Sequence, residues 1–245
     1  MFPLSHIYVS TKVTGRQSPL LIFGSVLPDI ATTSRNSIGR DKIHYAPNEF
    51  RQFVNSIFPE LSDLAIGVDL HSHINQGADF YSDNSEIGFA YIFGRKMVRD
   101  VMSLLGIDDE PKSLVLAHNL IEAGVDINLN TDHSEVLTLW RNSLKEMDIK
   151  KVISCLSSYL SLPADQLESE INFFVDFLGP DSLISVETIV DRIALPLVSM
   201  RYGKVIDRNQ TISILNTARD LTASDYMKLL DNAVSEITSH GKIKV

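Results

Sequence analysis

Residues 111–129, PKSLVLAHNLIEAGVDINL, form the stretch that decides the fold. The stretch opens with proline, which suits the first turn of a helix, and it is apolar on nearly every face. Such a helix must be covered by other elements, so we expect it to lie at the centre of the protein. It also carries His118 and Glu122, two polar groups that a buried helix needs a reason to hold.

Apolar residues recur at helical spacing along most of the remaining chain. The pattern predicts further helices over residues 3–13, 47–58, 85–105, 134–147, 151–162, 164–178, 186–202 and 223–239. Ser85 is a suitable N-cap and Gly106 a suitable C-terminal glycine for one of them. Pro196 is expected to kink or break its helix. Convincing alternating strands are missing, so we assign the chain to the all-α class.

The composition is that of an ordinary globular protein, with 245 residues, 44% hydrophobic and 22% charged. A net charge of −9 without any basic block argues against nucleic-acid binding through a basic patch. The single cysteine, Cys155, cannot form a disulfide framework, and its apolar helical context predicts a buried thiol. The N-terminus has no cationic start, and no apolar run is long enough to span a membrane. We therefore expect a cytoplasmic protein without a transmembrane segment. The sequence does not indicate its oligomeric state.

The histidines divide the chain unevenly. Six of the seven lie between positions 6 and 133, and only His240 lies beyond. We therefore expect residues 1–147 to form a metal-binding helical core that carries the chemistry. Residues 148–245 are expected to form a C-terminal helical extension packed on that core.

His118 and Glu122 are four residues apart on the central helix, so they share a face. An imidazole and a carboxylate at this spacing can reach one divalent cation together. The alternative is a hydrogen-bonded pair that serves only the stability of the core.

A second group of polar residues lies in GVDLHSHINQGADFYSD, residues 67–83. If residues 64–80 are helical, His71, Asn75 and Asp79 form one stripe, because each is four residues after the last. His73 then points to the other side, where it packs or supports the ligands. Asp69 and Asp83 are expected to be solvated or to cap helices.

Three further candidates lie nearer the N-terminus. Asp29 follows a proline at the end of the apolar run LLIFGSVLP, where it could also cap the next turn. His44 lies in a polar loop before Pro47, and His6 lies on the first helix. His133 and His240 are expected to be structural or solvated.

The order of these residues resembles that of the zinc-dependent phospholipase C family, whose all-helical fold is related to that of P1-type nucleases. The resemblance covers about residues 1–130, and GSVLPDI and HNLIE carry it most clearly. It implies a multi-helix phospholipase C-like bundle, here with additional C-terminal helices. In that family a first-helix His, the Asp of G-x-x-x-P-D, a loop His, a His-x-x-x-Asp helix and a His-x-x-x-Glu helix hold up to three zinc ions.

Carried over residue by residue, the resemblance implies two metal sites. Asp29, His44 and His71 would form the first, and His118 and Glu122, with Asp79 as a tentative ligand, would form the second. His6 would belong to the remnant of a third site or to the layer behind the ligands. Asp29 could also act as a general base. Asn75 and His73 are assigned to the layer behind the ligands.

Two departures from the family put the full zinc cluster in doubt. The family's Asp in the His-x-x-x-Asp helix is Asn75 here, and an amide is a poor bridging ligand. Secreted members begin with a tryptophan whose amine binds zinc, whereas this chain begins with Met1 and Phe2, so we expect that ligand to be missing.

The resulting hypothesis is a metal-dependent hydrolase that acts on a small phosphoester through a metal-activated water. Its cofactor would be zinc, one to three ions, with iron or manganese also compatible with His and carboxylate ligands. The main alternative is a degenerate, non-catalytic member that acts as a helical binding or regulatory protein. A histidine–aspartate phosphohydrolase is disfavoured because the chain has Asp132-His133 in the reverse order. A purely structural role for every polar pair remains the simplest alternative.

Overall fold

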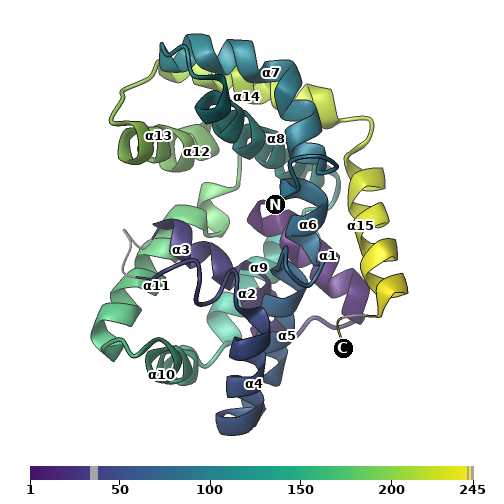
Figure 1. The fold of residues 1–245 in the computed structure, drawn as a ribbon, viewed down its shortest axis with the longest axis vertical. Helices are drawn as coiled ribbons and strands as arrows, with labels where there is room; N and C mark the ends of the chain where they lie inside the picture. Colours follow the sequence, from purple (N-terminus) through teal and green to yellow (C-terminus); the bar gives the residue numbers. More distant parts are fainter. Residues whose placement is uncertain (34–37, 242, 244–245) are drawn as a thin grey trace.

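The computed structural model describes residues 1–33, 38–241 and 243, and within these it contains helices and no strand (Figure 1). The all-α prediction is therefore confirmed for this part of the chain. The N-terminal half contains α1 (Pro3–Thr14), α2 (Pro19–Val26), η1 (Leu27–Asp29), α3 (Ile30–Thr33), α4 (Pro47–Ile57), η2 (Pro59–Leu61), α5 (Ser62–His71), α6 (Ala78–Asp83), α7 (Phe89–Leu105) and α8 (Glu110–Asp132). The remainder contains α9 (Glu135–Glu146), α10 (Ile149–Leu160), α11 (Ala164–Leu178), η3 (Pro180–Ser182), α12 (Val186–Ile189), η4 (Val190–Ala194), α13 (Leu195–Tyr202), α14 (Arg208–Thr222) and α15 (Tyr226–His240).

Helix α8 is the central, buried helix that the sequence predicts. The Asp109 side chain caps it by accepting a hydrogen bond of 3.0 Å from the Lys112 backbone N–H. Helices α7 and α14 pack along it, and α1, α9 and α15 also contact it (Figure 1). His118 and Glu122 are 7% and 4% exposed, so this helix does bury both polar groups.

Helices α2 and α5 cross at two glycines, which bring their backbones into contact. A Cβ atom on Gly24 would lie 2.2 Å from the Leu64 carbonyl oxygen, and one on Gly67 would lie 2.4 Å from the Leu21 carbonyl oxygen. No larger residue fits either position without separating the helices. Because η1 continues α2, this crossing fixes the position of Asp29 relative to His71 at the end of α5.

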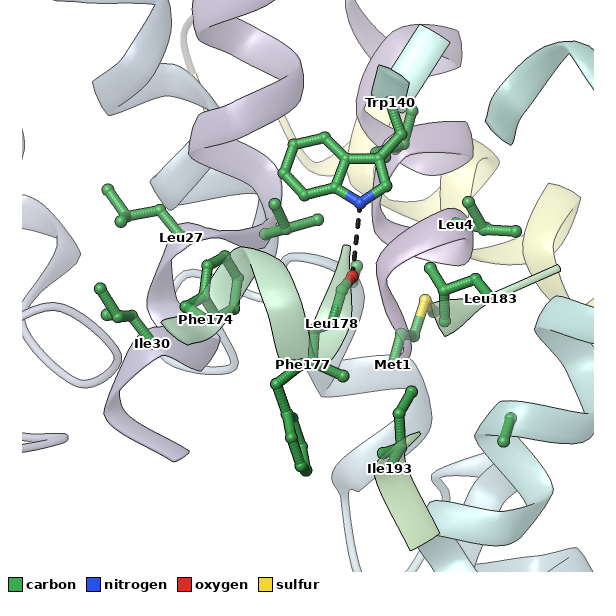
Figure 2. Packing of buried hydrophobic residues seen from close by; sticks show 14 of the residues in the cluster. Met1, Leu4, Leu27, Ile30, Trp140, Phe174, Phe177, Leu178, Leu183 and Ile193 are labelled. Carbon is green, nitrogen blue, oxygen red and sulfur yellow. Dashed lines mark hydrogen bonds between the residues drawn. The ribbon is translucent and has the colours of Figure 1, made fainter. Parts of the chain in front are cut away.

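The C-terminal helices share the core with the N-terminal ones. The only tryptophan, Trp140, is fully buried, and its indole N–H donates a hydrogen bond of 3.3 Å to the Leu178 carbonyl (Figure 2). Helix α15 packs on α1, and α11 packs on α3. The division into units 1–147 and 148–245 stays a prediction. Among the described residues, no helix has the length and apolarity that a bilayer span needs.

Two predicted helix boundaries are wrong. Residues 64–80 are not one helix, because α5 ends at His71 and α6 begins at Ala78. Between them the chain turns back on α5, so closely that a Cβ on Gly77 would lie 2.3 Å from the Leu70 carbonyl oxygen. Helix α7 begins at Phe89 rather than after Ser85. The reason is a turn in which the Asn84 side chain accepts hydrogen bonds from the backbone N–H groups of Glu86 and Ile87.

Other sequence signals have the expected outcome. Helix α7 ends at Gly106, which has the left-handed φ of 57° that glycine tolerates. Before Pro196 the α-helical pattern gives way to the π-helix η4, so the predicted interruption is present. Helix α14, which the sequence analysis does not identify, is capped by Asp207 and buries one face against α8.

Replacing Gly24 by alanine is expected to destabilise the protein by about 2 kcal/mol or more, because the new methyl group would overlap the α5 backbone. Urea unfolding followed by Trp140 fluorescence measures the change. Gly39→Ala is the matched control, since its Cβ meets only the end of the exposed Asp41 side chain. Equal stability of both variants would show that the α2–α5 crossing tolerates separation.

Candidate metal centre

The first turn of α1 is anchored to the central helix by a buried carboxylate. Asp126, one turn after Glu122 on α8, accepts hydrogen bonds of 2.7 and 2.9 Å from the backbone N–H groups of Leu4 and Ser5. Burial raises the pKa of Asp126 to about 7, although these donors act to lower it. This contact directs residues 1–2 towards Glu122 and fixes the position of His6 relative to α8.

Asp79 occupies the centre of the polar cluster, with 2% of its surface exposed. Its Oδ1 lies 2.7 Å from the Met1 amino nitrogen and 3.2 Å from His6 Nε2. Its Oδ2 lies 3.0 Å from His71 Nε2 and 3.2 Å from His44 Nε2. One carboxylate therefore faces three imidazoles and an amine that come from three separate segments of the chain.

A second group forms around His118. Its Nε2 lies 3.2 Å from Glu122 Oε1 and 3.2 Å from Asp83 Oδ1. The Tyr91 ring stacks on the imidazole at a centroid distance of 4.7 Å and fixes its plane. The Met1 amino group joins this group to the first, because it is 2.9 Å from Glu122 and 3.3 Å from Asp83.

His71 is oriented for ligation by its second ring nitrogen. Its Nδ1 lies 2.8 Å from the Ser25 carbonyl oxygen, which can only accept, so Nδ1 carries the proton. In the neutral ring, Nε2 then presents a lone pair to the cluster, in the arrangement that metal-binding histidines show. The ring also stacks on His6, at a centroid distance of 3.9 Å. Asp29 Oδ1 approaches Nε2 from the pocket side, at 3.9 Å.

The described residues contain three sets of donor atoms that could each hold a cation. They are His6, Asp29 and His71; His44, His71 and Asp79; and Asp83, His118 and Glu122. Within each set the donor atoms lie within 4.8 Å of one another. In a tetrahedral zinc site, neighbouring donor atoms are about 3.3 Å apart. The N···O distances of 3.0 to 3.2 Å around Asp79 and His118 are close to that value.

Several of these atoms are close to oxygen without forming hydrogen bonds. The Nε2 atoms of His6, His71 and His118 are buried and lack an aligned hydrogen-bond partner among the described residues, as does Glu122 Oε1. Buried polar atoms are rarely left in this state. Lone pairs that converge on one point, rather than pairing with donors, are what cation ligands require.

Burial and neighbouring charge separate the pKa values of the histidines. Burial, together with the charges of His71 and the amino terminus, lowers the pKa of His6 to about 4. Burial also acts to lower the pKa values of His71 and His118, but their carboxylate neighbours raise both.

Burial and neighbouring charge also shift the pKa values of the carboxylates in different directions. Burial by itself raises the pKa of Asp79, but His71, the amino terminus and His6 hold it well below its usual value. Burial and the charge of Asp83 raise the pKa of Glu122. The pKa of Asp83 is lowered, because the amino terminus and His118 outweigh the opposing effects of burial and Asp79. A proton bound within this group reduces the repulsion between the neighbouring carboxylates, as a bound cation would.

Most of the predicted site residues converge, but their grouping differs from the prediction. The cluster contains His6, Asp29, His44, His71, Asp79, His118 and Glu122. Asp79 belongs with His44 and His71 rather than with His118. It reaches them from α6, whose first residues bring it back over the end of α5, and not from a continuous helical stripe.

The two residues assigned to the layer behind the ligands do not have that role. Asn75 lies in the turn after α5 and donates to Asn48 and Asp69, away from the cluster. His73 borders the pocket and packs on Phe80. Asp69 is not solvated, because it is buried and paired with Arg51. His133 and His240 pair with nearby glutamates outside the cluster.

The sequence analysis misses two contributors. Asp83 was expected to be solvated or to cap a helix, but it faces His118. Its spacing to Asp79 is i, i+4 on α6, which could have identified it. The Met1 amino group was expected to leave its position vacant, but it is buried between Asp79 and Glu122. No spacing rule reveals this contact, since it depends on how α1 enters the core.

A pocket of about 450 Å³ opens over the cluster. Asp29, His44, Asp79, Asp83, His118 and Glu122 border one side of it. Apolar side chains of α11, η4 and α13 also border it, and Figure 2 shows Phe177 and Ile193 among the buried side chains. Arg40 also borders the pocket, and its guanidinium donates to His44 Nε2 at 3.2 Å. Buried metal-capable groups therefore meet a cavity large enough for a small molecule.

In protein treated with a chelator, His6 is expected to stay neutral until the pH falls to about 4. Its pKa is lower in the folded than in the unfolded state, so its contribution to stability falls as the pH drops from 6.5 towards 4. Histidine-ring NMR signals recorded across this range measure the midpoint, and His6→Gln identifies the signal. A midpoint near the ordinary value would show that the ring is more solvated than the structure indicates.

Asp83→Ala is expected to weaken zinc binding at least tenfold, about the loss caused by removing even an indirect support of a metal site. Competition with a chromogenic chelator measures the affinity. Asp181→Ala provides the control, because Asp181 is exposed and its ion pair among the described residues is with Arg141, away from the cluster. An unchanged affinity in Asp83→Ala would exclude Asp83 as a ligand.

Comparisons with protein-family models, curated proteins and solved structures each yield no match. The functional argument therefore depends on the geometry of the site.

Proposed function

We propose that this protein is a metal-dependent hydrolase of a phosphoester substrate, similar in fold and ligand order to the zinc-dependent phospholipase C family. The observation that carries the proposal is the convergence of four histidines and four carboxylates beneath one pocket. They come from four helices, the last turn before α3 and a loop, so no local structural need explains their meeting. Burying so many charged and imidazole groups together destabilises the folded state unless they bind a cation or another partner.

The residues fit zinc by their chemistry. Imidazole nitrogen and carboxylate oxygen are zinc's usual ligands where cysteine is absent, and the only cysteine, Cys155, is remote in sequence and buried. The unpartnered Nε2 atoms of His6, His71 and His118 support cation binding, since a lone pair without a donor is available for ligation. Iron and manganese accept the same ligands, so the donor set favours zinc without excluding them.

When bound, such ions lower the pKa of a coordinated water and offset the negative charge of a phosphoryl group in its transition state. The chain's own residues would orient the substrate and move protons. Asp29 is the candidate general base, because its side chain is 17% exposed, against 3% for Asp79, and borders the pocket. The buried carboxylates are better placed to hold ligands than to exchange protons with a substrate.

The non-catalytic alternative loses the two features that favoured it. Asn75 lies outside the cluster, and Asp79 supplies a carboxylate in its place. The Met1 amino group also lies within the cluster. A protein that only binds a partner through its helices has no need for the convergent imidazoles.

Metal analysis of the purified protein tests the proposal, with a C-terminal tag because the Met1 amino group is buried. We expect at least one zinc, iron or manganese ion per chain and hydrolysis of a chromogenic phosphoester. His71→Ala should lower the activity at least 100-fold, the upper end of losses at supporting residues of metal sites. His133→Ala, at a histidine outside the cluster, should leave both metal content and activity unchanged.

A protein that contains no metal and takes up no zinc on titration would falsify the proposal. His118, Glu122 and Asp29 would then be structural residues, and the search for function should turn to protein partners. Equal losses in His71→Ala and His133→Ala would show only a general effect of losing a histidine and would also count against a metal centre.

A further inference from the structure

The C-terminal helices contribute one cationic side chain, that of Arg201, to the lining of the pocket. Ile193, Leu197 and Arg201 all border the pocket and are spaced four residues apart through η4 and α13. Leu197 and Arg201 therefore share one face of α13, and Ile193 lies in the π-helical turn directly before it. Along this segment the apolar side chains of Ile193 and Leu197 are followed by the guanidinium group of Arg201.

Among the described residues the Arg201 side chain forms no ion pair or hydrogen bond, whereas the arginines at 16, 51, 141, 208 and 219 each pair with an aspartate. The exposed Arg99 and Arg192 side chains are likewise unpaired among these residues, but they do not border the pocket as Arg201 does. Arg201 also lies within the electrostatic reach of the cluster. Arg201 is an exposed residue at the border of the pocket, where partial desolvation lowers its pKa, with the charge of Arg40 acting in the same direction and that of Asp29 opposing it. Arginine remains charged through such shifts, so an unpaired cation faces the pocket.

Two guanidinium groups beside one cavity repel each other, and the net charge of the site determines what relieves the repulsion. Asp29, Asp79, Asp83 and Glu122 supply four negative charges, which two divalent cations would balance. The Met1 amino group, Arg40 and Arg201 then leave the site positive. A phosphomonoester carries close to two negative charges at neutral pH, whereas a phosphodiester carries one. The monoester compensates this surplus more completely.

The apolar wall indicates what the rest of the ligand is like. Phe177, Leu178, Ile193 and Leu197 border the same pocket as the carboxylates. Figure 2 shows the first three among the buried apolar side chains. These side chains favour an apolar or aromatic group and offer no hydrogen bonds to a sugar or a peptide. The volume of about 450 Å³ admits a small organic molecule.

We propose that Arg201 is a substrate-binding residue that selects phosphomonoesters with a small apolar or aromatic group over phosphodiesters. This inference rests on the proposed hydrolase function and names its substrate class. In the reaction, water oxygen bonds to phosphorus as the ester P–O bond breaks. One proton of the water passes to the departing alkoxide, so an alcohol and inorganic phosphate result. Arg201 contacts a phosphoryl oxygen that takes no part in bond breaking.

The test compares the metal-loaded wild type with Arg201→Met, Arg201→Lys and Arg192→Met. Arg192 is the matched control because it is exposed on the same helical segment and does not border the pocket. The substrates are 4-nitrophenyl phosphate and bis(4-nitrophenyl) phosphate. Arg201→Met should lower kcat/KM for the monoester at least tenfold, a loss expected for one charged hydrogen bond, and for the diester about threefold or less. Arg201→Lys should restore part of the monoester rate, and Arg192→Met should alter neither.

Calorimetric titration with inorganic phosphate separates this inference from the hydrolase proposal. If the loaded wild type binds phosphate and Arg201→Met binds it at least tenfold more weakly, the anion site stands even where neither ester is hydrolysed. Phosphate affinity that is absent, or equal in all variants, overturns the inference and leaves metal-dependent hydrolysis intact. Equal losses for both esters, or a wild-type preference for the diester, also overturn it. Circular dichroism of each variant confirms that the exposed substitutions leave the fold unchanged.

Discussion

The Asp79 carboxylate is the interaction on which the architecture of the cluster depends. It is 2% exposed and contacts His6, His44, His71 and the Met1 amino group, which come from three separate segments. A carboxylate buried this deeply is strongly destabilising unless positive charge or hydrogen-bond donors surround it. The segments must therefore meet at this point together. A cation, or protons in its absence, satisfies the same demand.

Rigid backbone contacts explain how helices deliver these side chains so closely. The glycines at 24 and 67 let α2 touch α5, which places the Ser25 carbonyl against His71 Nδ1. Asp126 fixes the first turn of α1 to α8 through two backbone hydrogen bonds. Neither contact is part of the cluster, yet each determines the position of a residue that is. Such supporting contacts are a general feature of built metal sites.

The helices after α8 complete the pocket rather than the cluster. The three sets of donor atoms come from residues 6–122, whereas the apolar wall and Arg201 come from residues 177–201. If the protein is the hydrolase proposed above, the N-terminal half would supply the chemistry and the C-terminal half would recognise the organic group of the substrate. A change in substrate could then arise in α11 and α13 without disturbing the ligands.

The sequence alone predicted the helical class and the central place of α8, because helical periodicity is a local property. Seven residues of the cluster were predicted from the order of His and acidic residues along the chain, through a resemblance to a family, and only for His118 and Glu122 does i, i+4 spacing on one helix suffice. It was wrong about the helix through 64–80, where the tight turn at Gly77 overrides periodicity. Only the tertiary structure decided that Asp79 serves His44 and His71, that Asp83 joins His118 and that the amino group of Met1 enters the site. Those contacts join segments far apart in the chain, and their geometry depends on helix crossings that no local pattern encodes.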